Sequence, residues 1–117
     1  MANEPGFKSL GTIRPKHAVI NGSGTTTIVS GVTGKKISVI GFLVTGSAIG
    51  TMTFKSDTDS ITGAMSLGLN GGTGNDVAAP LVGPYMPDGH FETAVGEALK
   101  ITASAGTASG YVTYIEV

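Results

Sequence analysis

The chain has 117 residues and a formal net charge of −1, and Asp, Glu, Lys and Arg make up 13% of it, against about 25% in an ordinary domain. This length is that of one domain, and the absence of cysteine excludes disulfides and thiolate metal sites. A small domain has a large surface for its volume. The low number of charged residues therefore predicts that a partner covers part of that surface.

Charge and hydropathy also narrow the classes of partner. The near-neutral chain argues against nucleic acid, because neutralising phosphates needs an excess of basic residues. No membrane partner is expected, because no stretch approaches the ~18 consecutive apolar residues of a spanning helix. Residues 1–10 contain Glu4 and Pro5 and no apolar run, which does not fit a signal peptide of the usual kind.

Residues 1–17 are predicted to form an extended N-terminal arm before a single domain at residues 18–117. Pro5 and Pro15 break regular structure in this segment. Apolar residues spaced by three suggest packing onto another surface, and a frayed terminus is the alternative. The candidate contact residues of the arm are Phe7, Lys8, Leu10, Ile13, Arg14 and Lys16.

The first half of the domain is predicted to contain a hairpin followed by a buried strand. Residues 18–20 lead into a hairpin-type turn at residues 21–24, and residues 25–30 form the returning strand. Residues 35–45 (KKISVIGFLVT) are apolar on both faces, which predicts a central strand covered on both sides. Alternation puts Leu43 on the face of Ile37 and Val39, and Gly41 marks a bulge or a close backbone approach.

The second half is predicted to be a series of short strands. Residues 51–56 (TMTFKS) alternate cleanly, residues 57–60 form a polar turn, and residues 70–76 form a glycine-rich loop. Further strands are expected at residues 61–69, 81–85, 90–93, 99–103 and 110–117. Eight or nine short strands and no convincing helix predict an all-β fold, an antiparallel β-sandwich or barrel.

No constellation of residues predicts catalysis. The histidines are His17 and His90, and no serine lies in a G-x-S-x-G elbow. Three carboxylates of a candidate glycosidase or hydrolase site (Asp88, Glu92 and Glu97) are better explained as solvated surface groups. The pair Asp57 and Asp59 lacks the rest of a calcium loop and fits a capped turn. We therefore predict no enzyme, no catalytic residue, no cofactor and no metal.

Four segments between residues 37 and 117 carry a resemblance to a known group of proteins. They are GTMTFKS at residues 50–56, ITGAM at 61–65, GEALKIT at 96–102 and GYVTY at 110–114. This pattern resembles the small β-rich virion proteins of tailed phages, of the head decoration or cement type. The resemblance implies a jelly-roll-like sandwich, commonly trimeric, with no catalytic residues to carry over.

Two functions from different classes follow from these observations. The first is a non-enzymatic virion structural protein on the capsid exterior, which bridges major capsid protein subunits and assembles as a homotrimer. Its arm would lie across a neighbouring subunit. The alternative is a phage tail or fibre module that binds a host-surface glycan or receptor through loops at residues 70–80 and 84–91. Tyr85 and His90 would then be solvent-facing contacts.

Overall fold

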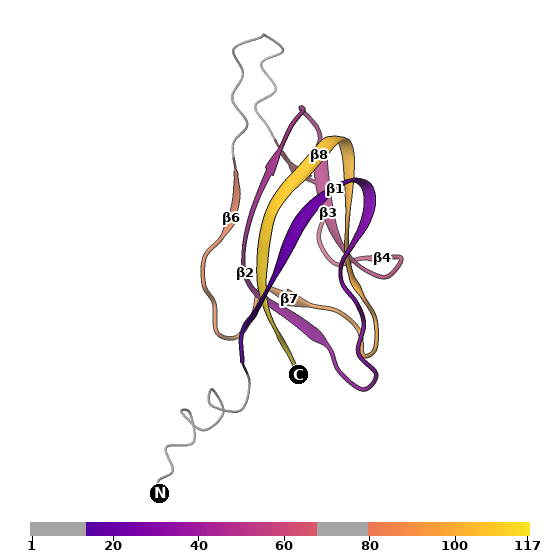
Figure 1. Cartoon of the computed structure of the whole chain (residues 1–117), viewed down its shortest axis with the longest axis vertical. Coiled ribbons are helices and arrows are strands. Elements are labelled where there is room, and N and C mark those ends of the chain that lie inside the picture. Colours follow the sequence, from indigo (N-terminus) through magenta and orange to yellow (C-terminus); the bar gives the residue numbers. More distant parts are fainter. Residues whose placement is uncertain (1–13, 68–79) are drawn as a thin grey trace, which may run out of the picture.

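The computed structural model describes residues 14–67 and 80–117, and these residues form antiparallel strands and no helix, which confirms the predicted all-β class. The strands belong to one hydrogen-bonded sheet (Figure 1). In chain order they are β1 (Lys16–Val29), β2 (Ile37–Gly46), β3 (Thr51–Ser56), β4 (Asp59–Ser60), β5 (Met65–Ser66), β6 (Leu81–Gly83), β7 (Phe91–Glu92) and β8 (Leu99–Glu116). The predicted arm overlaps the start of β1, and its residues 1–13, Phe7, Lys8, Leu10 and Ile13 among them, lie outside the described residues.

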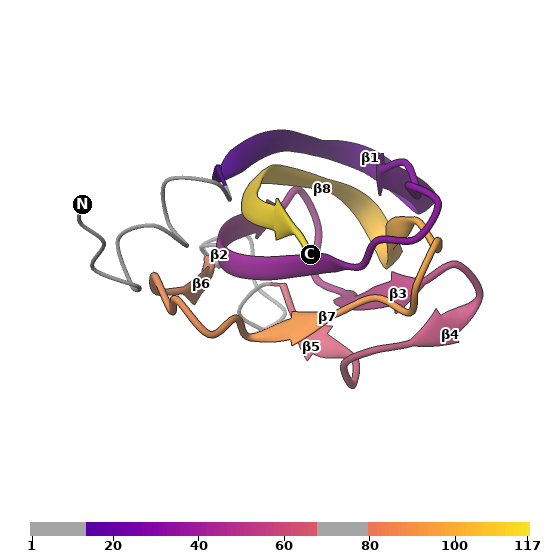
Figure 2. The same cartoon turned by 90° about the horizontal axis from the view of Figure 1, so that it is seen from below.

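The longest strand, β8, organises the sheet. One of its edges pairs with β1, while its other edge pairs with β3 over residues 99–103 and with β2 over residues 108–116. The β1–β8 ribbon bends where β1 shifts register between Gly22 and Gly24, opposite residues 104–107 of β8. The bend turns the two halves of the sheet toward each other, so that β1 and β8 lie above β3, β4 and β5 in Figure 2. This arrangement is compatible with the predicted sandwich.

The predicted hairpin at residues 21–24 is wrong, and so is the division of residues 99–117 into two strands. Each pair of predicted strands is one long strand that bends in its middle. Gly24 and Gly106 have φ angles of 64° and 65°, a conformation that glycine adopts without steric cost. Here these glycines bend a continuous ribbon, whereas the sequence pattern alone suggested that the chain reverses.

The core lies between the two halves of the bent sheet. Phe54 is fully buried, and its ring centroid lies 4.8 Å from that of Phe91 and 5.2 Å from that of Phe42. The predicted strand at residues 51–56 is confirmed, because Met52 and Phe54 are buried and the residues on the other face, Thr51, Thr53 and Lys55, are half-buried. Each such burial stabilises the fold by about 1.5–3 kcal/mol relative to an exposed side chain.

Of the two features expected at Gly41, a bulge or a close backbone approach, the structure shows a bulge, and it changes which residues share a face. The register of β2 against β8 shifts between Val39 and Gly41. Beyond this shift, Phe42 pairs with Val112 on the core side, and Leu43 pairs with Tyr111 on the opposite side. The predicted grouping of Leu43 with Val39 is therefore wrong, because the extra residue inverts the alternation.

The other predicted strands are shorter than expected. The strand predicted at residues 61–69 is reduced to Met65–Ser66 in the described part of the chain, and residues 68–69 lie outside it. The segment between β6 and β7 is held to β2 by two backbone hydrogen bonds, in which Met86 N–H donates to Ile40 O (2.9 Å) and His90 N–H to Val39 O (2.7 Å). This segment therefore follows β2 closely.

Candidate functional site

Four apolar side chains form a row across β1, β8, β2 and β6 on the face opposite the core. Val19 pairs with Tyr111, Tyr111 pairs with Leu43, and Leu43 pairs with Val82. Their exposed fractions are 75% for Val19, 44% for Tyr111 and 61% for Val82, and Leu43 is half-buried. A contiguous exposed apolar patch of this kind marks an interaction site more often than scattered surface residues do.

The rows on either side of these four residues contain no Lys, Arg, Asp or Glu. One consists of His17, Thr113 and Gly41, which are paired in register, and the other of Asn21, Ser109 and Thr45. We call the three rows together the outer face. It contains no Lys, Arg, Asp or Glu, so it combines an apolar centre with polar margins, as the centre and rim of a protein interface do.

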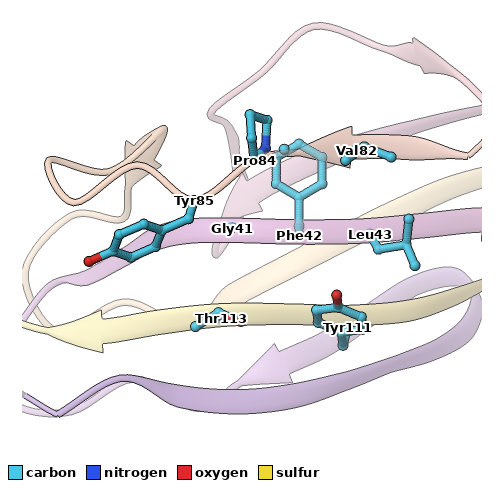
Figure 3. Close-up of a pocket in the computed structure, with 9 residues that line it drawn as sticks. Gly41, Phe42, Leu43, Val82, Pro84, Tyr85, Tyr111 and Thr113 are labelled. Atoms are coloured by element: carbon cyan, nitrogen blue, oxygen red, sulfur yellow. The ribbon is translucent and has the colours of Figure 1, made fainter.

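An open groove of about 270 Å³ lies along the outer face between β2 and β6 (Figure 3). Tyr85, which is 63% exposed, stands at one end of the groove, and Tyr111 and Leu43 line it from β8 and β2. Gly83 permits the close approach of β6 to β2, because a Cβ atom there would lie 2.2 Å from the ring of Phe42.

Of the six predicted arm residues, Arg14 and Lys16 lie in the described part of the chain. Arg14 is exposed just before β1. Lys16 Nζ lies 3.0 Å from Glu116 Oε1, and this hydrogen bond together with the charge of Glu116 raises the pKa of Lys16 above its ordinary value of 10.5. A second ion pair joins Lys36 to Glu92 at 2.9 Å, so basic residues of the first half meet acidic residues of the second.

The two predicted loop contacts have different surroundings. Tyr85 is largely exposed, whereas His90 is half-buried. The His90 ring lies 5.4 Å from that of Phe42, and its Nε2 atom is 2.7 Å from the carbonyl oxygen of Pro84. His90 therefore holds the segment after β6 in place, and Tyr85 presents its side chain to solvent.

Two of the three carboxylates considered for catalysis, Glu92 and Glu97, have different partners. Glu92 pairs with Lys36, and Glu97 accepts a hydrogen bond from the Ser56 hydroxyl. The Ser56 oxygen in turn accepts a hydrogen bond from Ala94 N–H at 3.0 Å. Glu97 therefore supports the connection between β7 and β8 through Ser56, whereas Glu92 is paired with Lys36 just before β2.

Asp57 also has a structural partner. Its backbone N–H donates to Ala98 O at 3.0 Å, and its Oδ1 atom accepts from Ala98 N–H at 3.1 Å. Asp57 has a φ angle of 50°, which fits the turn expected from the sequence. Within residues 14–67 and 80–117, no group of three or more His, Cys, Asp or Glu side chains is placed to hold a metal ion.

The sequence alone did not identify the outer face. Its residues come from four strands, and their alignment depends on the register of each pair and on the bulge in β2. The one sequence feature that pointed to this face was the strand at residues 35–45, which is apolar on both faces. The sequence pattern was interpreted as burial of both faces. One of those faces, at Leu43, contributes to the uncovered row.

No family model, curated protein or solved structure matches the chain. The resemblance to phage virion proteins therefore stays a prediction. In the described residues, the structure contains no helix of the length and apolar character needed to span a membrane.

Proposed function

We propose that this chain is a non-enzymatic virion structural protein that binds the exterior of a tailed-phage capsid and bridges its major capsid protein subunits. The outer face is the observation that supports this proposal most strongly. Val19, Tyr111 and Val82 expose apolar surface on a hydrogen-bonded sheet, and burying such surface against a partner is favourable because it removes apolar area from water.

The composition of the outer face suits a stable, uncharged contact. A specific interface commonly buries about 800 Å² on each partner, and a row that crosses four strands supplies an apolar centre for such a contact. Polar side chains at its margin, such as Asn21 and Thr45, are placed to hydrogen-bond at the rim. The proposed arm enters the fold at β1, next to Val19, so its contacts would extend the same surface.

Binding of this kind stabilises a shell by mass action. A protein that binds the assembled shell and not its separated subunits shifts the equilibrium toward the shell. The test is the temperature at which capsids release their DNA, measured with and without the bound protein. We expect a clear rise when the protein is bound. Equal resistance of the two preparations would refute the stabilising role.

A second candidate function is the binding of a host-surface glycan by a tail or fibre module. The observation that favours it is the groove beside Tyr85 and Tyr111, whose exposed rings offer flat apolar surfaces with polar ends. The Tyr85→Ala and Tyr111→Ala variants should then lose binding in a glycan array or a cell-binding assay. Unchanged binding of both variants would exclude this site.

A further inference from the structure

The strand β1 has a long free edge. Among the described residues, β1 pairs with β8 along one side, and its other side has no strand partner over 14 residues. The strands at the other borders of the sheet are much shorter: β4, β5 and β7 have two residues each and β6 has three. A long edge presents a row of unpaired N–H and C=O groups, which is a template for pairing with another strand.

The first half of this edge, residues 16–22, also lacks the features that normally prevent pairing. Proteins protect edges with proline, with charges or with bulges, and β6 is flanked by Pro80 and Pro84. Strand β1 contains no proline, and Lys16, which bonds to Glu116, is its charged residue. Residues 16–22 pair with residues 108–114 without a register shift, so this half of β1 is regular.

The hydrogen-bond pattern shows which backbone groups face the free edge. Lys36 and Val117 exchange two backbone hydrogen bonds, at 2.8 and 2.9 Å, where β2 meets the end of β8. Val117 therefore directs its backbone N–H and C=O toward β2, and the other odd-numbered residues at this end of β8 do the same, because the direction of these groups alternates along an antiparallel strand. The backbone groups of the even-numbered residues 108–116 consequently point toward β1. Their partners Ala18 and Ile20 bond to β8, so the backbone groups of His17, Val19 and Asn21 point away from it.

We propose that a second copy of this chain pairs with this edge about a two-fold axis, with Val19 opposite Val19 of the second copy. His17 then lies opposite Asn21, and each of these pairs exchanges backbone hydrogen bonds through the outward-pointing groups. Two like edges that meet in antiparallel form an isologous contact, which closes at two copies. This arrangement is an alternative to the homotrimer expected from the sequence and is independent of the proposed capsid role.

Three properties of the edge favour a second copy as its occupant. In this register Lys16 lies opposite Gly22, so no like charges meet across the axis. Residues 17, 19 and 21 have their side chains on the outer face, so equivalent side chains of both copies stay on the same side of the joined sheet. The row from Val82 to Val19 then continues into the second copy, which doubles the apolar surface.

The first experiment measures molar mass by light scattering over a range of concentrations. For a chain of 11.7 kDa, the wild type should approach twice that mass. The Val19→Pro variant should stay at the mass of one chain with an unchanged circular dichroism spectrum, because Val19 N–H faces the free edge and proline is tolerated there. A wild type that stays at one chain, or that forms a trimer, would overturn the proposal.

Matched charge variants separate the edge from the rest of the outer face. Val19→Lys places two like charges next to each other across the axis, and Val82→Lys makes the same change at the far end of the same apolar row. We expect Val19→Lys to dissociate the pair and Val82→Lys to leave it intact. If Val19→Lys stays paired, or if both variants dissociate equally, the copies are not joined through the β1 edge.

Cross-linking tests the register directly, because the chain has no native cysteine. In the proposed pair the two Val19 Cα atoms are about 5.5 Å apart, which lies within the range that a disulfide spans. The Val19→Cys variant should therefore form a covalent dimer on mild oxidation, whereas Val82→Cys should not. Equal yields from the two variants, or no dimer from Val19→Cys, would contradict the two-fold register.

Discussion

The two faces of the strands β1, β8, β2 and β6 are both apolar, and they differ in what covers them. On the inner face, Ile20, Val44 and Val112 are completely buried against the other half of the bent sheet. On the outer face, the row from Val19 to Val82 has no cover within the described chain. An apolar pattern in a strand therefore identifies surface that is suited to burial, and the tertiary fold decides whether the chain itself provides the cover.

The largest expected effect comes from the inner face. Phe54→Ala should reduce the free energy of unfolding by about 3–5 kcal/mol, because Phe54 is fully buried against Phe42 and Phe91. Urea denaturation measures this loss. The control is Tyr85→Ala, which removes an exposed aromatic ring and should change stability by less than about 0.5 kcal/mol. Similar losses in the two variants would contradict the assignment of the core.

A buried hydrogen bond should give the next largest effect. Thr93 is buried, and its Oγ1 atom accepts a hydrogen bond from Ile37 N–H at 2.9 Å. Thr93→Val keeps the shape of the side chain but leaves that buried donor without this acceptor, at a cost of about 1–3 kcal/mol. Thr25→Val, which removes an exposed hydroxyl pair with Thr102, is the matched control in urea denaturation and should be nearly neutral.

Changes on the outer face should alter folding stability much less. The double variant Tyr111→Thr and Val82→Thr removes apolar surface and keeps residues that favour strands. We expect its free energy of unfolding to lie within about 1 kcal/mol of the wild type, because both side chains are exposed. A loss as large as that of Phe54→Ala would show that the outer face belongs to the folding core.

The smallest effect should come from the ion pair between Lys16 and Glu116. Because the pKa of Lys16 is raised in the folded state, its stabilising contribution is present below pH 10.5 and is lost as pH rises through the folded pKa. Urea midpoints of wild type and Lys16→Met should therefore differ slightly at pH 8 and converge at higher pH. If the difference between the two urea midpoints grew above pH 10.5, the ion pair would not be the source of the stabilisation.

Local patterns in the sequence were enough to predict the fold class. The alternation of Met52 and Phe54 predicted β3 with its correct bounds, and Gly41 predicted the bulge in β2. The path of the chain between strands was harder to predict. Gly22, Gly24 and Gly106 fit a hairpin or a bend equally well, and long-range pairing with a distant strand selects the bend.

The candidate site was less predictable than the fold. The sequence pointed to the arm and to Tyr85 and His90, of which Tyr85 borders the groove on the outer face and His90 packs on Phe42. The row from Val19 to Val82 requires the register of three strand pairs, and one of these depends on a bulge. No window of the sequence contains that information, because the residues of the row are far apart along the chain.

The most direct test of the outer face as the proposed docking surface is co-sedimentation with assembled tailed-phage capsids. Wild type and the control variant Val95→Thr, which changes an exposed apolar residue elsewhere, should pellet with the shells. The folded double variant Tyr111→Thr and Val82→Thr should remain in the supernatant. If the double variant pellets as fully as the wild type, the outer face does not bind the capsid.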